Sequence, residues 1–179
     1  SRDEMQKPAE VMTALAFKAG ERVADVGAGS GYFTVPVAQA VGPSGKVWAV
    51  DIRQTMLDFI RDRLAVEGLA NVELLLAQPD DPMLPAGGLD TILMVDTIHY
   101  VKDRTAYGLK LAAALAPGGR LAIIDFRWDP DAEREFAPPP EQQVKREDLD
   151  ADLATAGFVP VESHDFLPEQ YFVVYRVGE

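Results

Sequence analysis

The chain has 179 residues, of which 47% are hydrophobic, and its formal net charge is −12. This length and hydrophobic content predict a folded domain with a sizeable core and exclude a disordered chain. The excess of acidic residues disfavours nucleic-acid partners, since nucleic-acid binding depends on basic patches. The absence of cysteine excludes disulfides, thiolate metal ligands and a thiol nucleophile.

No apolar run reaches the roughly 18 residues that a membrane span requires. The first five residues, Ser1-Arg2-Asp3-Glu4-Met5, are charged and do not resemble a secretory signal. We therefore expect a protein without a membrane span, and a cytoplasmic location.

Strand and helix patterns alternate along the chain. The first helix is expected over residues 8–19, from Pro8 to a stop at Gly20. The expected strands are residues 22–27, 46–51, 72–77, 90–95, 120–126, 158–164 and 171–177. The other expected helices are residues 31–41, 55–67, 102–116 and 145–156. Apolar strands that alternate with helices indicate an α/β fold, with a mostly parallel sheet covered on both faces.

One segment, residues 127–144, breaks this alternation. Acidic residues alternate with others, and three prolines follow at positions 138–140. We expect a surface loop or lid here, which is either solvated or lines a substrate pocket. Nothing after it is long enough for a second domain, so residues 1–179 are predicted to form a single domain.

A glycine-rich turn follows the first expected strand, in the sequence V-A-D-V-G-A-G-S-G-Y-F-T of residues 23–34. Gly27, Gly29 and Gly31 allow a sharp turn and let a ligand approach the main chain. Asp51 lies 22 residues beyond Gly29, at the end of the next strand. In α/β folds such a turn, with an acidic residue about that far on, binds adenosine, and the carboxylate accepts from the ribose hydroxyls.

The residue after Gly31 narrows the choice of ligand. The dinucleotide fingerprint G-x-G-x-x-G/A requires a small residue where this chain has Tyr32. An NAD(P)-dependent oxidoreductase is therefore disfavoured. The pattern D-x-G-x-G-x-G instead resembles motif I of the class I (Rossmann-like) S-adenosylmethionine-dependent methyltransferases.

Further segments resemble that family in the same order. They are V-W-A-V-D ending at Asp51, N-V-E-L from Asn71, L-D-T-I-L-M from Leu89, L-A-P-G-G-R-L from Leu115 and A-G-F from Ala156. The resemblance covers roughly residues 20–177. It implies a three-layer sandwich whose seven-stranded sheet has the order 3-2-1-4-5-7-6, with strand 7 antiparallel and helices on both faces. It also implies that residues 1–19 form an N-terminal helix or cap, which either covers the cofactor, with Met5, Gln6 and Phe17 near the acceptor, or simply docks against the sheet.

The resemblance implies S-adenosyl-L-methionine as the cofactor and assigns its contacts. The implied cofactor-binding residues are Asp25, Gly27, Gly29, Gly31, Asp51, Ile52 and Gln78. The glycines would border the methionine part and ribose, Asp25 would help to hold the ammonium, and Ile52 would pack on the adenine. Asp25 as a capping residue and Asp51 as an exposed turn acid are the alternatives.

The position that follows the third strand departs from the family pattern. Relatives often carry an acid there that accepts from the adenine amino group, whereas this chain has Gln78. The Gln78 carbonyl can still accept, and either Asp80 or Asp81 is the alternative.

The predicted function is methyl transfer to a small-molecule acceptor by direct displacement, which requires alignment and exclusion of water and no nucleophilic residue. The alternative is a catalytically silent cofactor-binding sensor or partner subunit. The sequence names neither the acceptor nor the oligomeric state.

The predicted substrate pocket comprises Asp96, His99 and Tyr100, just after the fourth strand. An acceptor hydroxyl would need a base, and His99 is the candidate because imidazole titrates near neutrality. His99 as a packing residue, Tyr100 as a pocket wall and Asp96 as a helix cap are the alternatives. The two histidines, His99 and His164, lie far apart in the sequence, so no metal site is predicted.

Overall fold

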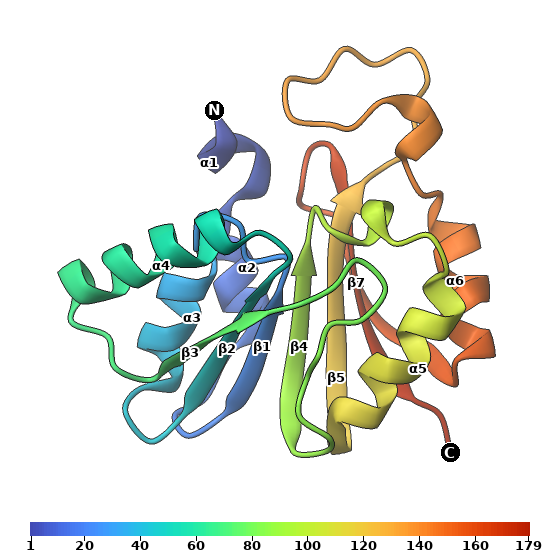
Figure 1. Cartoon of the computed structure of the whole chain (residues 1–179). Helices are drawn as coiled ribbons and strands as arrows, with labels where there is room; N and C mark the ends of the chain where they lie inside the picture. Colours follow the sequence, from blue (N-terminus) through green and yellow to red (C-terminus); the bar gives the residue numbers. More distant parts are fainter.

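The seven strands of the chain form one sheet in the order β3-β2-β1-β4-β5-β7-β6 (Figure 1). The structure is a computed structural model that describes residues 1–179. The strands are β1 (Arg22–Val26), β2 (Lys46–Asp51), β3 (Val72–Leu76), β4 (Leu89–Val95), β5 (Leu115–Phe126), β6 (Phe158–His164) and β7 (Gln170–Val177). Neighbours from β3 to β5 pair in parallel, and β7 pairs antiparallel with both β5 and β6. The predicted strand order and the antiparallel strand 7 are confirmed.

Helices cover both faces of this sheet. They are α1 (Arg2–Gln6), α2 (Pro8–Leu15), α3 (Thr34–Val41), α4 (Gln54–Glu67), α5 (Arg104–Ala114) and α6 (Arg146–Thr155), with the short 3-10 helices η1 (Ile98–Tyr100) and η2 (Pro140–Gln142). Val23 and Val47 face α2 and α3, whereas Ala24 and Trp48 face the side of α5 and α6. Because successive strand residues point to opposite faces, these apolar strands fill two cores at once.

The predicted first helix, residues 8–19, is wrong at its end. Helix α2 stops at Leu15, where Ala16 takes a left-handed backbone (φ 48°) and its N–H donates to the Met12 carbonyl at 3.0 Å. Alanine is a good helix former, so the sequence pattern predicted no helix end before Gly20. A separate helix, α1, precedes it.

The predicted helix over residues 102–116 also ends early. Helix α5 stops at Ala114 because Leu115 has an extended backbone (ψ 139°) and begins β5, pairing with Leu89 of β4. Strand pairing therefore takes the residues that the sequence pattern had assigned to the last helical turn.

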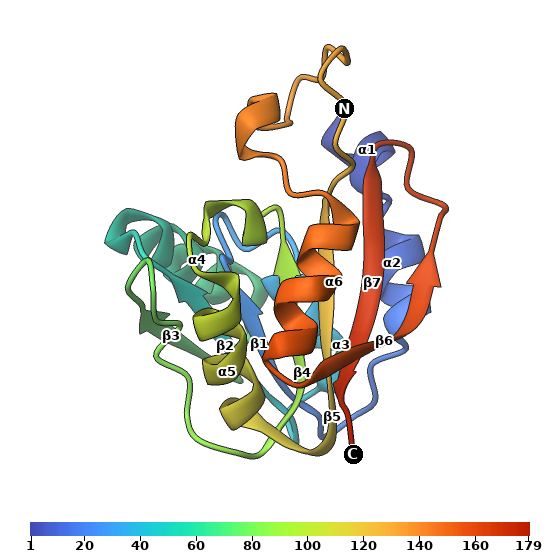
Figure 2. The ribbon, with the colours of Figure 1, turned by 90° about the vertical axis from the view of Figure 1, so that its right-hand side faces the viewer.

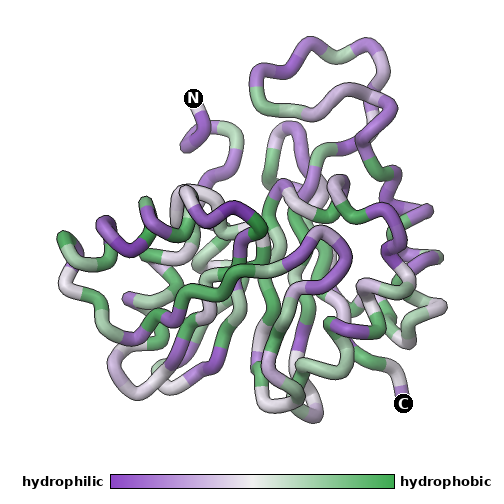
Figure 3. Tube along the Cα trace, viewed as in Figure 1, coloured by the Kyte–Doolittle hydropathy of each residue, from purple (hydrophilic) through white to green (hydrophobic).

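Three segments surround the carboxyl edge of the parallel strands. They are α1, residues 127–145 and the connection between β6 and β7 (Figures 1 and 2). The strands below are mainly hydrophobic, whereas the segment over residues 127–145 is mainly hydrophilic (Figure 3). None of the helices has the length and apolar character that a membrane crossing requires.

Four aspartates lie at this edge, each at or beside the end of a strand. They are Asp25 of β1, Asp51 of β2, Asp96 directly after β4 and Asp125 of β5. Parallel pairing brings these strand ends together, so residues up to 100 positions apart in the chain become neighbours at one edge. Open α/β sheets bind their ligands at this edge.

Candidate active site

A pocket of about 550 Å³ opens at the carboxyl edge of β1, β2 and β4. It is lined by the turn after β1, the end of β2, the start of the loop after β3 and the segment after β4, with Arg2 of α1 and Tyr107 of α5. Of the residues predicted from the sequence, it includes Gly27, Gly29, Asp51, Ile52, Gln78, Asp96 and Tyr100. The lining does not include Asp25, Gly31 or His99.

The turn after β1 is shaped by two glycines that serve different purposes. A Cβ on Gly27 (φ 77°) would lie 2.0 Å from the Thr97 hydroxyl, so this glycine allows the segment after β4 to pack closely. A Cβ on Gly29 (φ 56°) would meet no atom within 4 Å. Gly29 therefore leaves an open space above the turn, where a ligand can approach the backbone.

Asp51 faces this open space from the end of β2. Its side chain is only 5% exposed. Oδ2 accepts from the Gly29 N–H at 2.9 Å, and Oδ1 accepts from the Arg53 N–H at 3.0 Å and from Arg53 Nε at 3.4 Å. A carboxylate has about four acceptor positions, so Asp51 can still accept from a diol, and the exposed Arg53 side chain can give way. Asp51 is therefore not the exposed turn acid that the alternative reading expected.

The residues predicted to contact the adenine line the same pocket. Ile52 lines the pocket and is 53% exposed, and Gln78 lines it beside Pro79. Asp81 instead accepts from the Met83 N–H at 2.8 Å and lies 3.6 Å from Lys110, and Lys110 also donates to the Asp80 carbonyl. Only Gln78 of the three candidates therefore lies in the pocket.

Asp25 lies behind the glycine turn and is buried. Its Oδ2 accepts from the Thr34 hydroxyl at 2.7 Å. Burial raises the pKa of Asp25 to about 6, with a smaller contribution from the nearby Asp51 carboxylate, although the Thr34 hydrogen bond lowers it. A direct contact of Asp25 with a ligand would therefore need a movement or a water, and its predicted role stays a prediction.

Asp96 is held in the pocket by residues from both ends of the chain. Its Oδ2 accepts from Gln6 Nε2 at 2.6 Å, and its Oδ1 accepts from Gln170 Nε2. Its backbone is left-handed (φ 54°), an uncommon state for a residue other than glycine. Burial raises the pKa of Asp96 to about 7, and the Asp125 carboxylate adds to that shift. Asp96 caps no helix, since Asp103 caps α5 through the Ala106 N–H.

His99 lies beside the pocket and contacts an acid that sequence reasoning missed. Its Nδ1 is 2.9 Å from both carboxylate oxygens of Asp125, and its backbone N–H donates to Asp125 Oδ2 at 3.2 Å. The two side chains are 3% and 1% exposed. Tyr100, by contrast, is 69% exposed, with its ring centroid 4.2 Å from the imidazole. The signal for Asp125 was its place at the end of an apolar strand, the same place that Asp51 occupies in β2.

The N-terminal segment reaches the pocket through α1. Arg2 lines the pocket, and its guanidinium lies 4.0 Å from the centre of the Tyr32 ring. The expectation that Gln6 lies near the acceptor position agrees with its bond to Asp96. Phe17 lies elsewhere: it packs under Arg120, which pairs with Thr91 toward the amino end of β4. The expectation for Phe17 is therefore wrong, because α2 ends early and the chain turns down the sheet.

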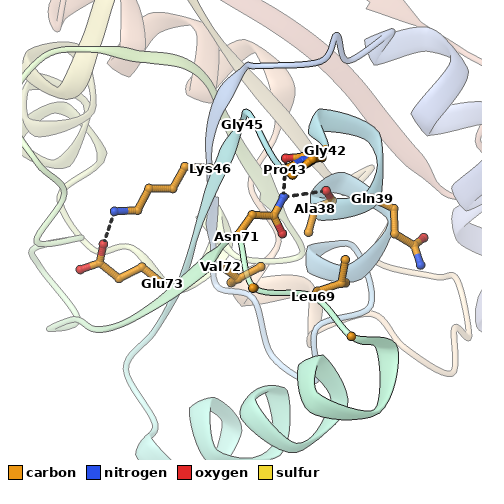
Figure 4. Close-up of a pocket in the computed structure, with 12 residues that line it drawn as sticks. Ala38, Gln39, Gly42, Pro43, Gly45, Lys46, Leu69, Asn71, Val72 and Glu73 are labelled. Carbon is orange, nitrogen blue, oxygen red and sulfur yellow. Dashed lines mark hydrogen bonds and ion pairs between the residues drawn. The ribbon is translucent and has the colours of Figure 1, made fainter.

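A larger cavity, of about 850 Å³, lies at the opposite edge of the sheet (Figure 4). Its two charged residues, Lys46 and Glu73, pair with each other at 2.6 Å. Asn71 Nδ2 donates to the carbonyls of Ala38 and Gly42 at 2.9 Å each, which stabilises the end of α3. This cavity therefore offers structural contacts and no free reactive group. No three His, Asp or Glu side chains are arranged to hold a metal ion.

Comparison with known sequences identifies relatives of the chain. The sequence profile of a family described as "Methyltransferase domain" matches residues 23–119, more than half of the chain. The ubiquinone/menaquinone biosynthesis C-methyltransferase UbiE of Burkholderia cenocepacia is 33% identical over 113 residues, which are 62% of this chain and 46% of that protein. The chain thus matches just under half the length of this curated relative.

Solved structures share the fold over nearly the whole chain. A SAM-dependent methyltransferase from Aquifex aeolicus superposes with a TM-score of 0.90 at 29% identity, covering 99% of this chain and 93% of that one. The glycopeptide N-methyltransferase MtfA, solved with sinefungin, has a TM-score of 0.78 at 16% identity, with 99% and 87% covered. At that identity MtfA is evidence for the fold alone.

Proposed function

The chain belongs to the class I S-adenosylmethionine-dependent methyltransferases, and from this premise we propose that it methylates a small molecule in the pocket at the carboxyl edge. Its cofactor is S-adenosylmethionine, and the reaction is methyl transfer. The proposal adds which residues hold the cofactor and where the acceptor binds.

The observation that carries the proposal is the position of Asp51 against Gly29. The carboxylate is buried and fixed by the Gly29 and Arg53 N–H groups, yet it borders the open space over a glycine that carries no Cβ. That arrangement fits a ribose diol, since a fixed carboxylate accepts from both hydroxyls at little entropic cost. Ile52 and Gln78 would then contact the adenine, and Gly27 and Gly29 the sugar and methionine part.

Methyl transfer requires the protein mainly to position the cofactor and the acceptor. When bound, the cofactor supplies a methyl group on a positively charged sulfur. Thr97, Val101 and Tyr107 line the pocket in which the two reactants meet, and alignment of the two reactants can supply roughly 7–11 kcal/mol. Asp96, where ionised, places a negative charge beside the cationic cofactor.

The acceptor would enter between α1 and residues 127–144, which we propose act as a lid. Trp128 and Phe136 of this segment are nearly half exposed. The segment is stabilised by its own bonds, including Gln143 Nε2 to the Pro138 carbonyl at 2.9 Å and Arg134 to the Arg127 carbonyl at 2.7 Å. A small acceptor suits a pocket of about 550 Å³ that must also hold the cofactor. The single-domain organisation of residues 1–179 and the cytoplasmic location stay predictions.

Calorimetry tests the assignment of the pocket. S-adenosylhomocysteine should bind one site per chain, and Asp51→Ala should weaken that binding. NADH should not bind. Binding of NADH without S-adenosylhomocysteine, or unchanged affinity in a folded Asp51→Ala variant, would contradict the proposal.

A further inference from the structure

His99 and Asp125 form a buried pair at the carboxyl edge in which only one of the two imidazole nitrogens contacts the carboxylate. Asp125 contacts the imidazole at Nδ1 only, at 2.9 Å, and Asp125 itself is fixed by the N–H groups of His99 and Phe126. A carboxylate can accept but not donate, so Nδ1 must carry the hydrogen. The Nε2 atom of His99 therefore carries a lone pair.

The second imidazole nitrogen, His99 Nε2, has no hydrogen-bond partner within the protein. It makes no hydrogen bond with another residue, and the fully buried polar side-chain atoms without a partner are Asn71 Oδ1 and Gln170 Oε1 only. Nε2 therefore still reaches accessible space, although the side chain as a whole is 3% exposed. Asp96, Thr97 and Tyr100, the residues around it in the chain, all line the pocket. The imidazole ring also contacts the Tyr100 ring, with 4.2 Å between their centroids, so His99 lies directly behind a side chain that lines the pocket.

On the basis of the proposed function, we infer that His99 is the general base of the methyl transfer, that Asp125 is its positioning residue, and that the acceptor atom is a hydroxyl oxygen. An amine acceptor with a free lone pair needs no such base before it attacks. A hydroxyl does, because its oxygen becomes a strong nucleophile only as its proton leaves. A base with a fixed tautomer and an orienting acid is the arrangement that proton removal requires.

The step balances without a further reactant. The hydroxyl oxygen forms a bond to the methyl carbon while the bond from that carbon to sulfur breaks, and its electron pair stays on sulfur. The hydroxyl proton moves to His99 Nε2, and Asp125 stabilises the imidazolium that results. The imidazolium then loses the proton to water after the product leaves.

The other charged and titratable groups around His99 come from three elements. Asp96 follows β4, Tyr100 belongs to η1 with His99, and Tyr171 of β7 pairs with Asp125 across the strands. Burial raises the pKa of Asp96 to about 7. A pH profile would therefore include a contribution from Asp96, so the test uses acceptors that differ in their need for a base.

The probes are phenol, nitrophenol and aniline with S-adenosylmethionine at mildly alkaline pH, where nitrophenol is already ionised and phenol is not. His99→Gln should lower kcat for phenol about 10²- to 10⁴-fold and change kcat for nitrophenol far less. Asp125→Asn should give the same selective loss, because an amide can donate to Nδ1 and favour the wrong tautomer. His164→Gln, at the second histidine of the chain, is the matched control and should change neither.

A selective loss with phenol supports the inference. Equal losses with phenol and nitrophenol, no loss, or methylation of aniline but not of either phenol would overturn it. S-adenosylhomocysteine binding, measured on the same variants, separates this outcome from failure of the proposed function: if the wild type does not bind it, the pocket is wrong, and if it does, only the base is wrong.

A second measurement needs neither acceptor nor cofactor. Nitrogen NMR of the folded wild type should show His99 with its hydrogen on Nδ1 when neutral, and Asp125→Asn should shift the population toward hydrogen on Nε2. A wild-type His99 with its hydrogen on Nε2 would overturn the inference even where no probe is methylated, and hydrogen on Nδ1 would support it.

Discussion

The two halves of the carboxyl edge are built in different ways. The cofactor half comes from β1, β2 and the turn between β1 and α3, and its key contact joins Gly29 to Asp51, 22 residues apart. The acceptor half joins Gln6 to Asp96 across 90 residues, Gln170 to Asp96 across 74 and His99 to Asp125 across 26. The first half depends on a short stretch of backbone. The Asp96 contacts of the second half exist only when both ends of the chain are folded together.

Gly27→Ala should have the largest effect, because it disturbs the place where the cofactor half packs against the segment after β4. The new Cβ would overlap the Thr97 side chain, which costs roughly 1–3 kcal/mol, and the left-handed backbone adds roughly 1–2 kcal/mol. We expect a lower midpoint in urea unfolding and loss of S-adenosylhomocysteine binding. Gly68→Ala, at a left-handed glycine (φ 66°, ψ 31°) with open space around its Cβ, is the control for backbone strain, and an equal loss there would contradict the role of the clash.

Asp51→Ala should weaken cofactor binding without unfolding the chain. Removing a charged acceptor from the ribose costs roughly 1.5–3 kcal/mol, a decrease in affinity that calorimetry with S-adenosylhomocysteine resolves. Asp58→Ala changes an exposed acid of α4 that pairs with Arg61 and should leave the affinity as it is. Equal affinities in the two variants would mean that the carboxylate of Asp51 does not contact the ligand.

The acceptor half should make the ligand-free protein less stable as pH rises. The pKa of Asp96 is raised from 3.8 to about 7, so the folded state keeps a proton that the unfolded state loses. The free energy of unfolding therefore falls between about pH 4 and pH 7, by at most about 1.4 kcal/mol per pH unit. Asp25, with a pKa raised to about 6, acts in the same direction.

Asp96→Asn removes one of these two groups, so urea unfolding of the variant should depend less on pH in that range. The same slope in variant and wild type would show that Asp96 is ionised in the folded state throughout.

Gln6→Ala should have the smallest effect. It removes the hydrogen bond from α1 to Asp96, worth roughly 1 kcal/mol, and should make α1 exchange its amide hydrogens faster while cofactor affinity changes little. Thr13→Ala, at an exposed position of α2 that bonds only its own helix, serves as the control. Loss of cofactor binding in Gln6→Ala would mean that the two halves are not separable.

Most elements followed from local patterns. β2 and β6 have the predicted bounds, residues 46–51 and 158–164, because an apolar run and its turn residues are both local. The errors lie where the folded chain overrides propensity: α2 ends at Leu15 although Ala16 is a good helix former, and β5 takes Leu115 from the predicted helix. The choice among Gln78, Asp80 and Asp81 needed the fold, because only Gln78 lines the pocket, whereas Lys110 of α5 pairs with the Asp81 carboxylate and donates to the Asp80 backbone carbonyl.

By itself, the sequence determined the strand order through its family resemblance, and it placed the glycine turn and Asp51, since a turn and the next strand end are fixed by nearby residues. Only the tertiary structure paired His99 with Asp125 and enclosed Asp96 between Gln6 and Gln170. Hydrogen bonds between distant side chains depend on which strand ends meet and on how the chain ends fold back. The hydrophobic periodicity of the sequence does not predict these partners, because it indicates on which face of a helix or strand a residue lies and not which distant residue it contacts.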